Sequence, residues 1–406
     1  MTPTHLCIVA RLMRNADRAI LFATMLLLAV SGCDQLSGRN QNRQGGRWYR
    51  DGKFPDALAL YEQALKKVED PIVHFNTGLA YRGVFKAGYD KPVLLAFQAE
   101  DVCKNIPNTK PVEASICVKE GDRHYNGNEC DDKTACPALS TCTKTTFCSM
   151  MSTDIANVAA THLQTWLKVQ PSDDVLHAEI AKVEAQIADL NEKLEADAGK
   201  PDKKAEGAAL EDQIKDLGKR IDDLKAKFHV RDMMTQMWLD SDQYTKALDY
   251  WTALLNEKPN DPSLMAVLAG INLKANDWRK SIEWYLKVAA ATKDVSAKAT
   301  AYQFIGNVAW SKLNSHTLST LDSVELADRG IGALQKAIEL QPESTKPVGL
   351  QASLFNFRGT ANGASWATAI DRASAQDLQR TLHVLNDKAK QKAALQPPPT
   401  PVHPGG

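Results

Sequence analysis

The sequence predicts an all-α protein in which pairs of helices stack into a solenoid. Two observations support this fold class. A pattern of small and large apolar residues at helical spacing is clearest between Tyr244 and Pro259, and it returns several times along the 406-residue chain. Strand patterns, in contrast, are scarce. We therefore expect similar helical units joined by turns.

The recurring pattern has a fixed spacing. Ala247 is followed by Trp251 four positions later and by Leu254 after seven, and a proline then ends the helix. The same positions elsewhere carry Ala57, Tyr61 and Ala64, with Glu69 in place of proline; Ala159, Leu163, Trp166 and Pro171; Ser281, Tyr285 and Val288; and Gly330, Leu334, Ala337 and Pro342. Because helices that cross closely need a small side chain at the contact and larger ones beside it, the spacing predicts a repeated helix pair.

This pattern resembles the second helix of the tetratricopeptide repeat (TPR), a helix–turn–helix unit of about 34 residues. The first helix of such a unit fits as well. The position where this helix contacts its partner takes a small residue, and here it holds Thr235, Ala269 and Gly306. The small residue followed by an aromatic one, typical of the same helix, is matched by Gly78 and Tyr81. The resemblance implies a solenoid in which each repeat buries its apolar face against its neighbours, and a function in binding protein partners.

The predicted fold class is thus an all-α, TPR-like helical solenoid with an antiparallel coiled-coil hairpin insertion and a cysteine-rich insert. In order, the predicted segments are a lipoprotein signal peptide (1–32), a tether or a frayed first helix (33–47), TPR-like repeats (48–102), the cysteine-rich insert (103–150), a TPR-like helix (151–173), the coiled-coil hairpin (174–227), TPR repeats (228–345), C-terminal helices (346–395) and a Pro-rich tail (396–406). We expect residues 311–324 to bulge from the solenoid as a loop, and residues 359–363 to break the C-terminal helices.

The N-terminal segment carries the signals of an exported protein. Three arginines precede an apolar run of twelve residues, which is too short to span a bilayer comfortably. The run ends in Val30-Ser31-Gly32-Cys33, which is similar to the bacterial lipobox. This resemblance implies that Cys33 is acylated and that the protein is lipid-anchored in the bacterial cell envelope, facing the periplasm, with the choice of membrane open. The alternative is an ordinary signal peptide or an anchor helix.

Six cysteines gather in the insert. They are Cys103, Cys117, Cys130, Cys136, Cys142 and Cys148. In an exported protein an even number predicts disulfides, here three, which staple a segment too polar to build its own core. Six cysteines allow fifteen pairings, and the sequence does not choose among them. A metal site is the alternative; it is disfavoured because no Cys-x-x-Cys occurs and only His124 lies in the insert.

Two heptad seams follow the insert. Their apolar residues are Leu176, Ile180, Val183, Ile187, Leu190 and Leu194, and then Leu210, Ile214, Leu217, Ile221, Leu224 and Phe228. A ten-residue break rich in glycine and charge separates them, so we expect an antiparallel hairpin. The hairpin fills one in-register gap between repeats, and its second helix should therefore run directly into a repeat helix at Phe228. The arm is either a spacer or a surface for a coiled-coil partner.

Composition and motifs argue for binding rather than catalysis. Basic and acidic residues balance at 49 each, which argues against a nucleic-acid partner. No nucleophile elbow, zinc-protease motif or glycine fingerprint occurs, so we expect neither an enzyme nor a cofactor. Some TPR proteins grip a C-terminal carboxylate with lysine and asparagine. The corresponding positions here are Asp232, Gln236, Ala266, Gly270, Gln303 and Asn307, and this clamp is absent.

The resemblance implies that first-helix residues line a groove for a protein or peptide partner. These residues are Asp232, Gln236, Leu239, Leu273, Lys274, Gln303, Asn307 and Trp310. Trp310 is the strongest candidate, because buried aromatic side chains tend to anchor interfaces. We therefore expect a membrane-anchored adaptor that mediates protein–protein interaction in the assembly of an envelope complex. The alternative is a metal-binding or redox protein centred on the cysteine-rich insert.

Overall fold

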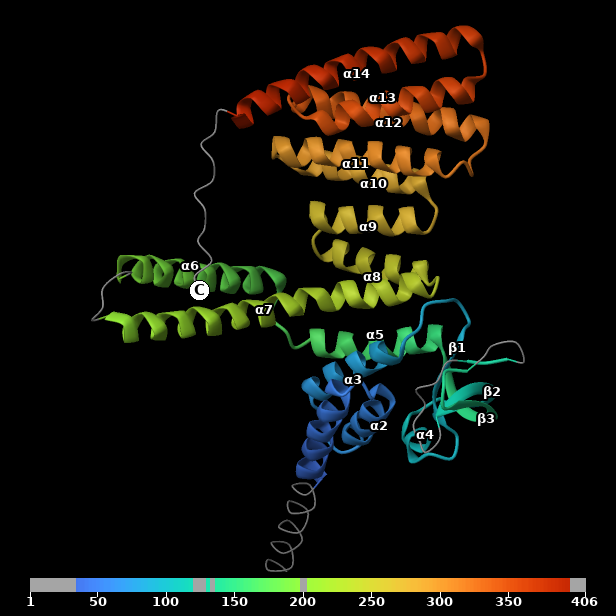
Figure 1. The fold of residues 1–406 in the computed structure, drawn as a ribbon, viewed down its shortest axis with the longest axis vertical. Coiled ribbons are helices and arrows are strands. Elements are labelled where there is room, and N and C mark those ends of the chain that lie inside the picture. Colours follow the sequence, from blue (N-terminus) through green and yellow to red (C-terminus); the bar gives the residue numbers. More distant parts are fainter. Residues whose placement is uncertain (1–33, 120–128, 132–135, 198–202, 395–406) are drawn as a thin grey trace, which may run out of the picture. The chain divides into compact units, whose positions relative to one another are not determined.

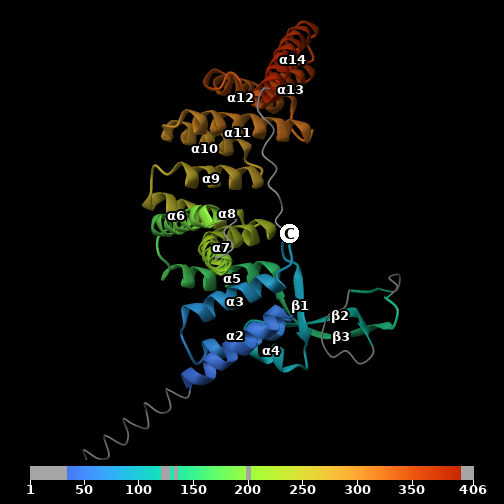
Figure 2. The ribbon, with the colours of Figure 1, turned by 60° about the vertical axis from the view of Figure 1, so that its left-hand side comes forward.

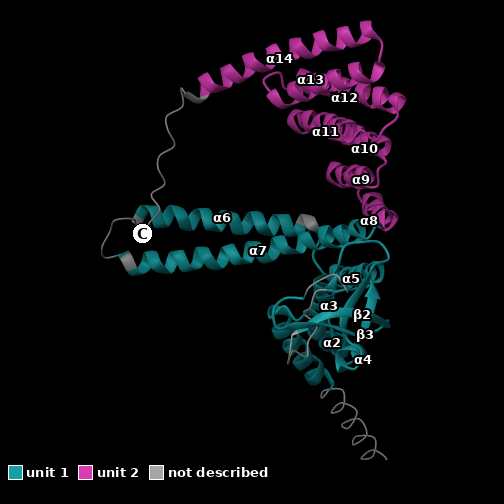
Figure 3. Ribbon diagram, turned by 45° about the vertical axis from the view of Figure 1, so that its right-hand side comes forward, with its two compact units in different colours: residues 1–242 teal, residues 243–406 magenta. Residues whose placement is uncertain are grey.

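The computed structural model describes residues 34–119, 129–131, 136–197 and 203–394. The chain divides into two compact units, residues 1–242 (unit 1) and 243–406 (unit 2), shown in Figure 3. Helices dominate both units and form the TPR-like fold that the sequence predicts (Figure 1). Within the described ranges, no helix combines the length and the apolar character needed to cross a membrane. The predicted signal peptide, Cys33 and the Pro-rich tail lie outside the described residues.

Residues 34–50 are helical and form the first helix of unit 1, which contacts α2 (Phe54–Leu65). Gly45 allows the contact, because a Cβ atom there would lie only 2.6 Å from Cε1 of the Tyr61 ring. The segment predicted as a tether or a frayed first helix (33–47) is therefore helical over residues 34–47, which contradicts the tether and agrees with the helix. Gly45 allows two helices to approach each other closely, whereas the glycines of this segment suggested a flexible link.

The second repeat is formed by α3 (Pro71–Val84) and α5 (Ser152–Leu167), which pack against each other. A Cβ atom on Gly78 would lie 2.6 Å from Cγ of Leu163. Both residues occupy positions that the repeat spacing identifies, so the small-residue contact is present where it was predicted. The whole segment between these two helices is an insertion within a single repeat.

This insertion contains a three-stranded antiparallel sheet (Figure 2). Its elements are β1 (Pro92–Phe97), α4 (Asp101–Asn105), β2 (Lys110–Lys119) and β3 (Ser140–Met151), with the strands in the order β1-β3-β2. The central strand β3 leads directly into α5. The sheet is thereby fixed to the repeat at the C-terminal end of β3.

The sheet has a small core of its own, in which Leu94, Ile116 and Phe147 are buried together. Phe97 stacks on Phe147 with ring centroids 4.9 Å apart. The predictions that the insert lacks a core and begins at residue 103 are therefore wrong. The apolar run of β1 precedes the first cysteine, and a short run of this kind reads equally well as part of a buried helix.

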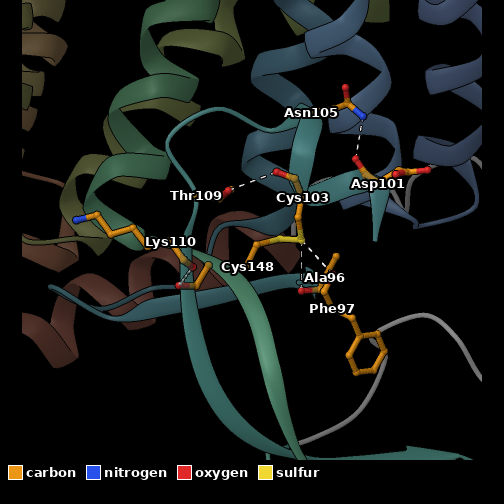
Figure 4. Close-up of a disulfide and its surroundings, with 9 residues drawn as sticks. Ala96, Phe97, Asp101, Cys103, Asn105, Thr109, Lys110 and Cys148 are labelled. Atoms are coloured by element: carbon orange, nitrogen blue, oxygen red, sulfur yellow. Dashed lines mark hydrogen bonds between the residues drawn. A yellow bond between two sulfur atoms is a disulfide. The ribbon is translucent and has the colours of Figure 1, made fainter. Parts of the chain in front are cut away.

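Three disulfides join the six cysteines of the insert, as predicted, in the pairs Cys103–Cys148, Cys117–Cys136 and Cys130–Cys142. The first pair is buried and ties α4 to β3 (Figure 4). There the sulfur of Cys103 lies 3.1 Å from the carbonyl oxygen of Phe97. Each of the other two pairs has one cysteine on a strand, Cys117 on β2 and Cys142 on β3, and these two residues are opposite each other.

The predicted hairpin consists of α6 (Asp173–Asp197) and α7 (Lys204–Asp240) (Figure 1). At its base Leu176, Ile180 and Leu224 form a buried cluster. Toward the tip the seam residues are only half-buried; they are Ile187, Leu190, Leu194, Leu210, Ile214 and Leu217. As expected, α7 continues without a break from the hairpin into the repeat, where its C-terminal part packs against α5.

Unit 2 is a stack of helices, each of which packs against the next along the chain. They are α8 (Tyr244–Glu257), α9 (Pro262–Lys274), α10 (Trp278–Ala291), α11 (Val295–Asn314), α12 (Thr320–Leu340), α13 (Thr345–Asn362) and α14 (Ser365–Ala394). The break expected at 359–363 falls at Gly363, whose positive φ of 67° ends α13. One buried cluster, which includes Ile305, Leu334 and Leu354, links the helices α9 to α13.

The residues expected to bulge as a loop, 311–324, instead lengthen α11 and α12, and only a short turn remains between them. Ser319 caps α12, since its hydroxyl oxygen accepts a hydrogen bond from the backbone N–H of Asp322 at 3.1 Å. Leu313 is buried and Leu318 packs against the core of unit 2. The loop prediction is therefore wrong, because the apolar residues of this segment draw it onto the solenoid.

Candidate functional site

Unit 2 contains an open groove of about 590 Å³ at the C-terminal ends of α11 and α13. We call it the Trp310 groove. Its lining residues are Trp310, Leu313, His316, Leu318, Thr320, Ser323, Ser353, Asn356, Phe357, Thr360 and Ala361. None of these eleven residues is Asp, Glu, Lys or Arg. The groove therefore offers aromatic rings together with hydroxyl and amide groups.

The aromatic residues of the groove come from α11, from the turn that follows it and from α13. Trp310 stands on the penultimate turn of α11 and is 41% exposed, which is high for so large an apolar side chain. Phe357 lies on α13 and packs partly against the core. His316 follows α11 in the turn that Ser319 closes, and its ring centroid lies 6.4 Å from that of Phe357. The shortened turn thus places His316 beside α13.

Of the eight residues predicted to bind a partner, Trp310 alone lines this groove. Gln303 and Asn307 lie on the same helix and are half-buried. Lys274 is exposed at the end of α9, whereas Leu273 packs against the core of unit 2. Leu273 therefore supports the fold of this unit.

The other three predicted residues belong to unit 1, where they lie on the C-terminal part of α7. Asp232 and Gln236 are exposed, and Leu239 is half-buried. The amide nitrogen of Gln236 donates a hydrogen bond to the Asp240 carboxylate at 2.5 Å. The predicted set is thus divided between two units and does not form one site within either.

Sequence reasoning missed most of the groove, including His316, Leu318, Asn356 and Phe357. The first two were placed in a solvent loop, and the last two in C-terminal helices with no assigned role. One signal was available. Leu318 is an apolar residue inside a segment rich in Ser and Thr, and such a residue indicates that the segment packs against the core.

Unit 1 holds a buried polar network that the sequence did not indicate. Its members are Glu62 on α2, His74 and Tyr81 on α3, and His162 on α5. The Tyr81 hydroxyl donates to Oε1 of Glu62 at 2.8 Å, and Nδ1 of His74 lies 2.8 Å from Nδ1 of His162. Nε2 of His162 lies 3.8 Å from Glu62. The network joins three helices, so we interpret it as a packing element.

Burial controls the protonation of this network. Burial lowers the pKa of His162 to about 4, and the neighbouring His74 lowers it further. Burial also lowers the pKa of His74, although the nearby charges of Glu69 and Asp70 act in the opposite direction. It raises the pKa of Glu62, although the Tyr81 hydrogen bond and Lys66 oppose this shift. The two histidines therefore favour folding when neutral, whereas Glu62 favours folding when protonated.

The two histidines should consequently make unit 1 less stable in acid, while Glu62 acts in the opposite direction, and His162→Gln should remove the His162 part of the loss. Between pH 6.5 and about 4, the unfolded chain binds a proton at residue 162 that the folded chain does not, so the free energy of unfolding falls as pH falls. The His162 contribution is about 2 kcal/mol between pH 7 and pH 4.5. Urea unfolding at both pH values measures it.

His383→Gln, on the exposed surface of α14, is the control and should keep the wild-type pH dependence. An identical acid loss in wild type and His162→Gln would contradict the assignment.

Comparison with known proteins agrees with the helical repeats. A family model described as tetratricopeptide repeat matches residues 49–83, a span that contains α2 and nearly all of α3. The chain has a TPR-like fold. A search of curated proteins finds no match.

Solved structures similar to this TPR-like chain include BtubC (BKLC) from P. vanneervenii, with 12% sequence identity and a TM-score of 0.28, over 55% of this chain and 95% of that chain. Yeast Tom70 is similar with 14% identity and a TM-score of 0.14, over 86% of this chain and 76% of that chain. Scores this low carry no argument about function.

Proposed function

We propose that this protein is a membrane-anchored adaptor of the bacterial cell envelope that holds a protein partner in the Trp310 groove and takes part in assembling an envelope complex. The observation that carries the proposal is the groove itself. It combines an exposed tryptophan on α11 with a second aromatic ring on α13, on a solenoid of the type that binds proteins. Binding, rather than catalysis, is the activity that we propose.

The lining chemistry indicates the kind of partner. The lining holds no Asp, Glu, Lys or Arg that could form an ion pair with a charged group of the ligand, and burying an unpaired charge is costly. Apolar and aromatic side chains can pack on Trp310 and Phe357. Thr320, Ser353 and Asn356 can hydrogen-bond to the backbone of an extended or helical peptide. The proposed ligand is therefore a peptide segment with an uncharged apolar anchor.

The test uses peptides selected by display on the immobilised wild-type protein. Trp310→Ala should weaken the binding of such peptides at least about tenfold, since an aromatic hot-spot residue contributes about 2 kcal/mol or more. Trp366→Ala is the matched control, because Trp366 is 71% exposed on α14 and lies outside the groove. Peptides that bind Trp310→Ala and the wild type equally well would place the binding surface elsewhere, and the coiled-coil arm would then be the next candidate.

The membrane part of the proposal depends on Cys33, which lies outside the described residues. The apolar run and Val30-Ser31-Gly32-Cys33 support acylation at this residue. In bacteria fed a labelled fatty acid, the wild-type protein should carry the label and Cys33→Ala should carry none. Labelled Cys33→Ala protein would refute the anchor and leave the groove proposal intact.

A further inference from the structure

The fold of the insert brings together cysteines that are far apart in the sequence. The sulfur atoms of Cys117, Cys130 and Cys136 all lie within 4.8 Å of one another. Cys142 is bonded to Cys130, and it also faces Cys117 across the β2–β3 pair. Two disulfides thus lie side by side, with the Cys142 sulfur joined to the group of three through its bond to Cys130. We call these four residues the four-cysteine cluster.

We propose that the four-cysteine cluster, once its two disulfides are reduced, binds one tetrahedral thiophilic metal ion of the zinc type. This proposal does not depend on the Trp310 groove or on the membrane anchor. The sequence disfavoured a metal because no Cys-x-x-Cys pair occurs. The fold removes that objection. In other thiolate sites the ligands are close together because they are close in the sequence, whereas here the sheet and its connections bring the cysteines together.

The distances suit such an ion. A zinc–sulfur bond of about 2.3 Å in a tetrahedron places neighbouring sulfurs about 3.8 Å apart. The sulfurs of Cys117 and Cys136 are bonded at 2.00 Å and must separate after reduction, while the Cys130 sulfur lies within 4.8 Å of both. Each of the three therefore needs to move by about 1 Å to take three of the four positions. Cys142 can supply the fourth, because directly opposed residues of an antiparallel pair have Cβ atoms about 5 Å apart.

The backbone holds these ligands independently of the disulfides. Cys117 and Cys142 are both in the β2–β3 ladder. The N–H of Cys130 donates to the carbonyl oxygen of Ser115 on β2 at 2.9 Å, and the adjacent residue Glu129 forms a bridge with Ile116. Three of the four cysteines thus keep their positions relative to the sheet after reduction. A preformed site of this kind lowers the ordering cost of metal binding.

Access to the cluster begins at Cys142, which is exposed, whereas Cys117 and Cys130 are buried. The thiolate of a dithiol reductant attacks the sulfur of Cys142, the Cys130–Cys142 bond breaks, and Cys130 leaves as a thiolate. That thiolate lies within 4.8 Å of both sulfurs of the second disulfide, so thiol–disulfide exchange can carry the reduction inward.

Reducing both disulfides of the cluster takes two dithiols. Each disulfide accepts two electrons and two protons from one dithiol, which itself becomes a disulfide. The four resulting thiols bind the divalent cation as thiolates and release four protons. All four ligand atoms are sulfur, and thiolates select zinc-type ions over magnesium or calcium.

The third disulfide supplies an internal control. Cys103–Cys148 joins α4 to β3, where Cys148 pairs with Pro111, at the opposite end of the ladder from Cys142. Neither cysteine of this pair belongs to the group of neighbouring sulfurs. Removing this pair should therefore leave metal binding in place.

The experiment titrates Co²⁺, as a spectroscopic probe for zinc, into the purified full chain before and after anaerobic reduction with a phosphine. The reduced protein should bind one Co²⁺ per chain with the absorption of a tetrahedral thiolate complex, and Zn²⁺ should displace it. The oxidised protein should not bind. Cys136→Ser should weaken binding at least about 100-fold, since groups that merely orient metal ligands already contribute about 10–100-fold. The double variant Cys103→Ser/Cys148→Ser should bind like the wild type.

A second measurement needs no variant. In the reduced wild type, Zn²⁺ should slow alkylation of Cys117, Cys130, Cys136 and Cys142 at least about tenfold and leave Cys103 and Cys148 unprotected, as read by mass spectrometry of the peptides. Reduced protein that binds no Co²⁺, binding that Cys136→Ser preserves, or protection spread equally over all six cysteines would each overturn the proposal.

Discussion

Replacing Arg358 with leucine should lower the free energy of unfolding of unit 2 by about 3–5 kcal/mol, the loss typical of breaking a buried ion pair from one side. Arg358 on α13 donates to both carboxylate oxygens of Asp371 on α14, with distances of 3.1 Å from Nε and 2.6 Å from Nη2. Its Nη1 donates to Asp328 on α12 at 2.6 Å. Asp371 is only 2% exposed, so its carboxylate would remain buried without its partner.

The electrostatics of Arg358 support this expectation. Its hydrogen bonds to Asp371 hold the pKa of Arg358 above its ordinary value, and this effect exceeds that of burial, which acts in the opposite direction. The bidentate geometry also fixes the guanidinium plane, so the pair orients α13 against α14. Because α14 packs against α13 and this ion pair joins the two helices, the amides of α14 should exchange fastest in Arg358→Leu.

Urea unfolding of the full chain, followed by circular dichroism, measures the loss. Arg380→Leu is the matched control on α14, since Arg380 pairs with Asp377 and both side chains are more than 70% exposed. This control should change stability by less than about 1 kcal/mol. The double variant Arg358→Leu/Asp371→Leu should recover much of the loss, because it leaves no buried charge unpaired. Equal effects of Arg358→Leu and Arg380→Leu would contradict the assigned role.

The repeat contacts could be predicted from the sequence because they rest on one local requirement. Gly78, Gly306 and Gly330 all fall at positions that the repeat spacing assigns to small residues. In each case an added Cβ atom would come within 2.6 Å of a neighbouring leucine side chain. Such a requirement repeats with the helix geometry, so a single sequence without homologues is enough to find it.

The insert and the groove depend on contacts between distant segments, which the sequence does not encode locally. β1 pairs with β3 across more than 40 intervening residues, and the disulfide pairing follows from that sheet. The groove joins Trp310 to Phe357 only because α11 and α13 are neighbours and the turn between α11 and α12 is short. Periodicity identifies each element, but it does not identify these partners.

Replacing Gly330 with alanine should destabilise unit 2 by about 1–3 kcal/mol, the range typical of overpacking a close helix contact. The new Cβ atom would lie 2.5 Å from Cδ1 of Leu354 and 2.6 Å from Cβ of Ala309. Both neighbours are fully buried, at 0% exposure, and the Cβ atom of Ala309 cannot move without its helix. Alanine is otherwise favoured over glycine in a helix by about 1 kcal/mol, so the sign of the effect depends on the contact.

Gly332 provides the matched control, because it lies on the same helix and an added Cβ atom there would meet nothing within 4 Å. Gly332→Ala gains the helix propensity without the clash and should stabilise unit 2 by about 0.5–1 kcal/mol. The two variants make the same chemical change two residues apart and should move the urea midpoint in opposite directions. If both raise the midpoint, α12 and α13 can separate to accept the methyl group, and the small residue at this repeat position is not required by packing.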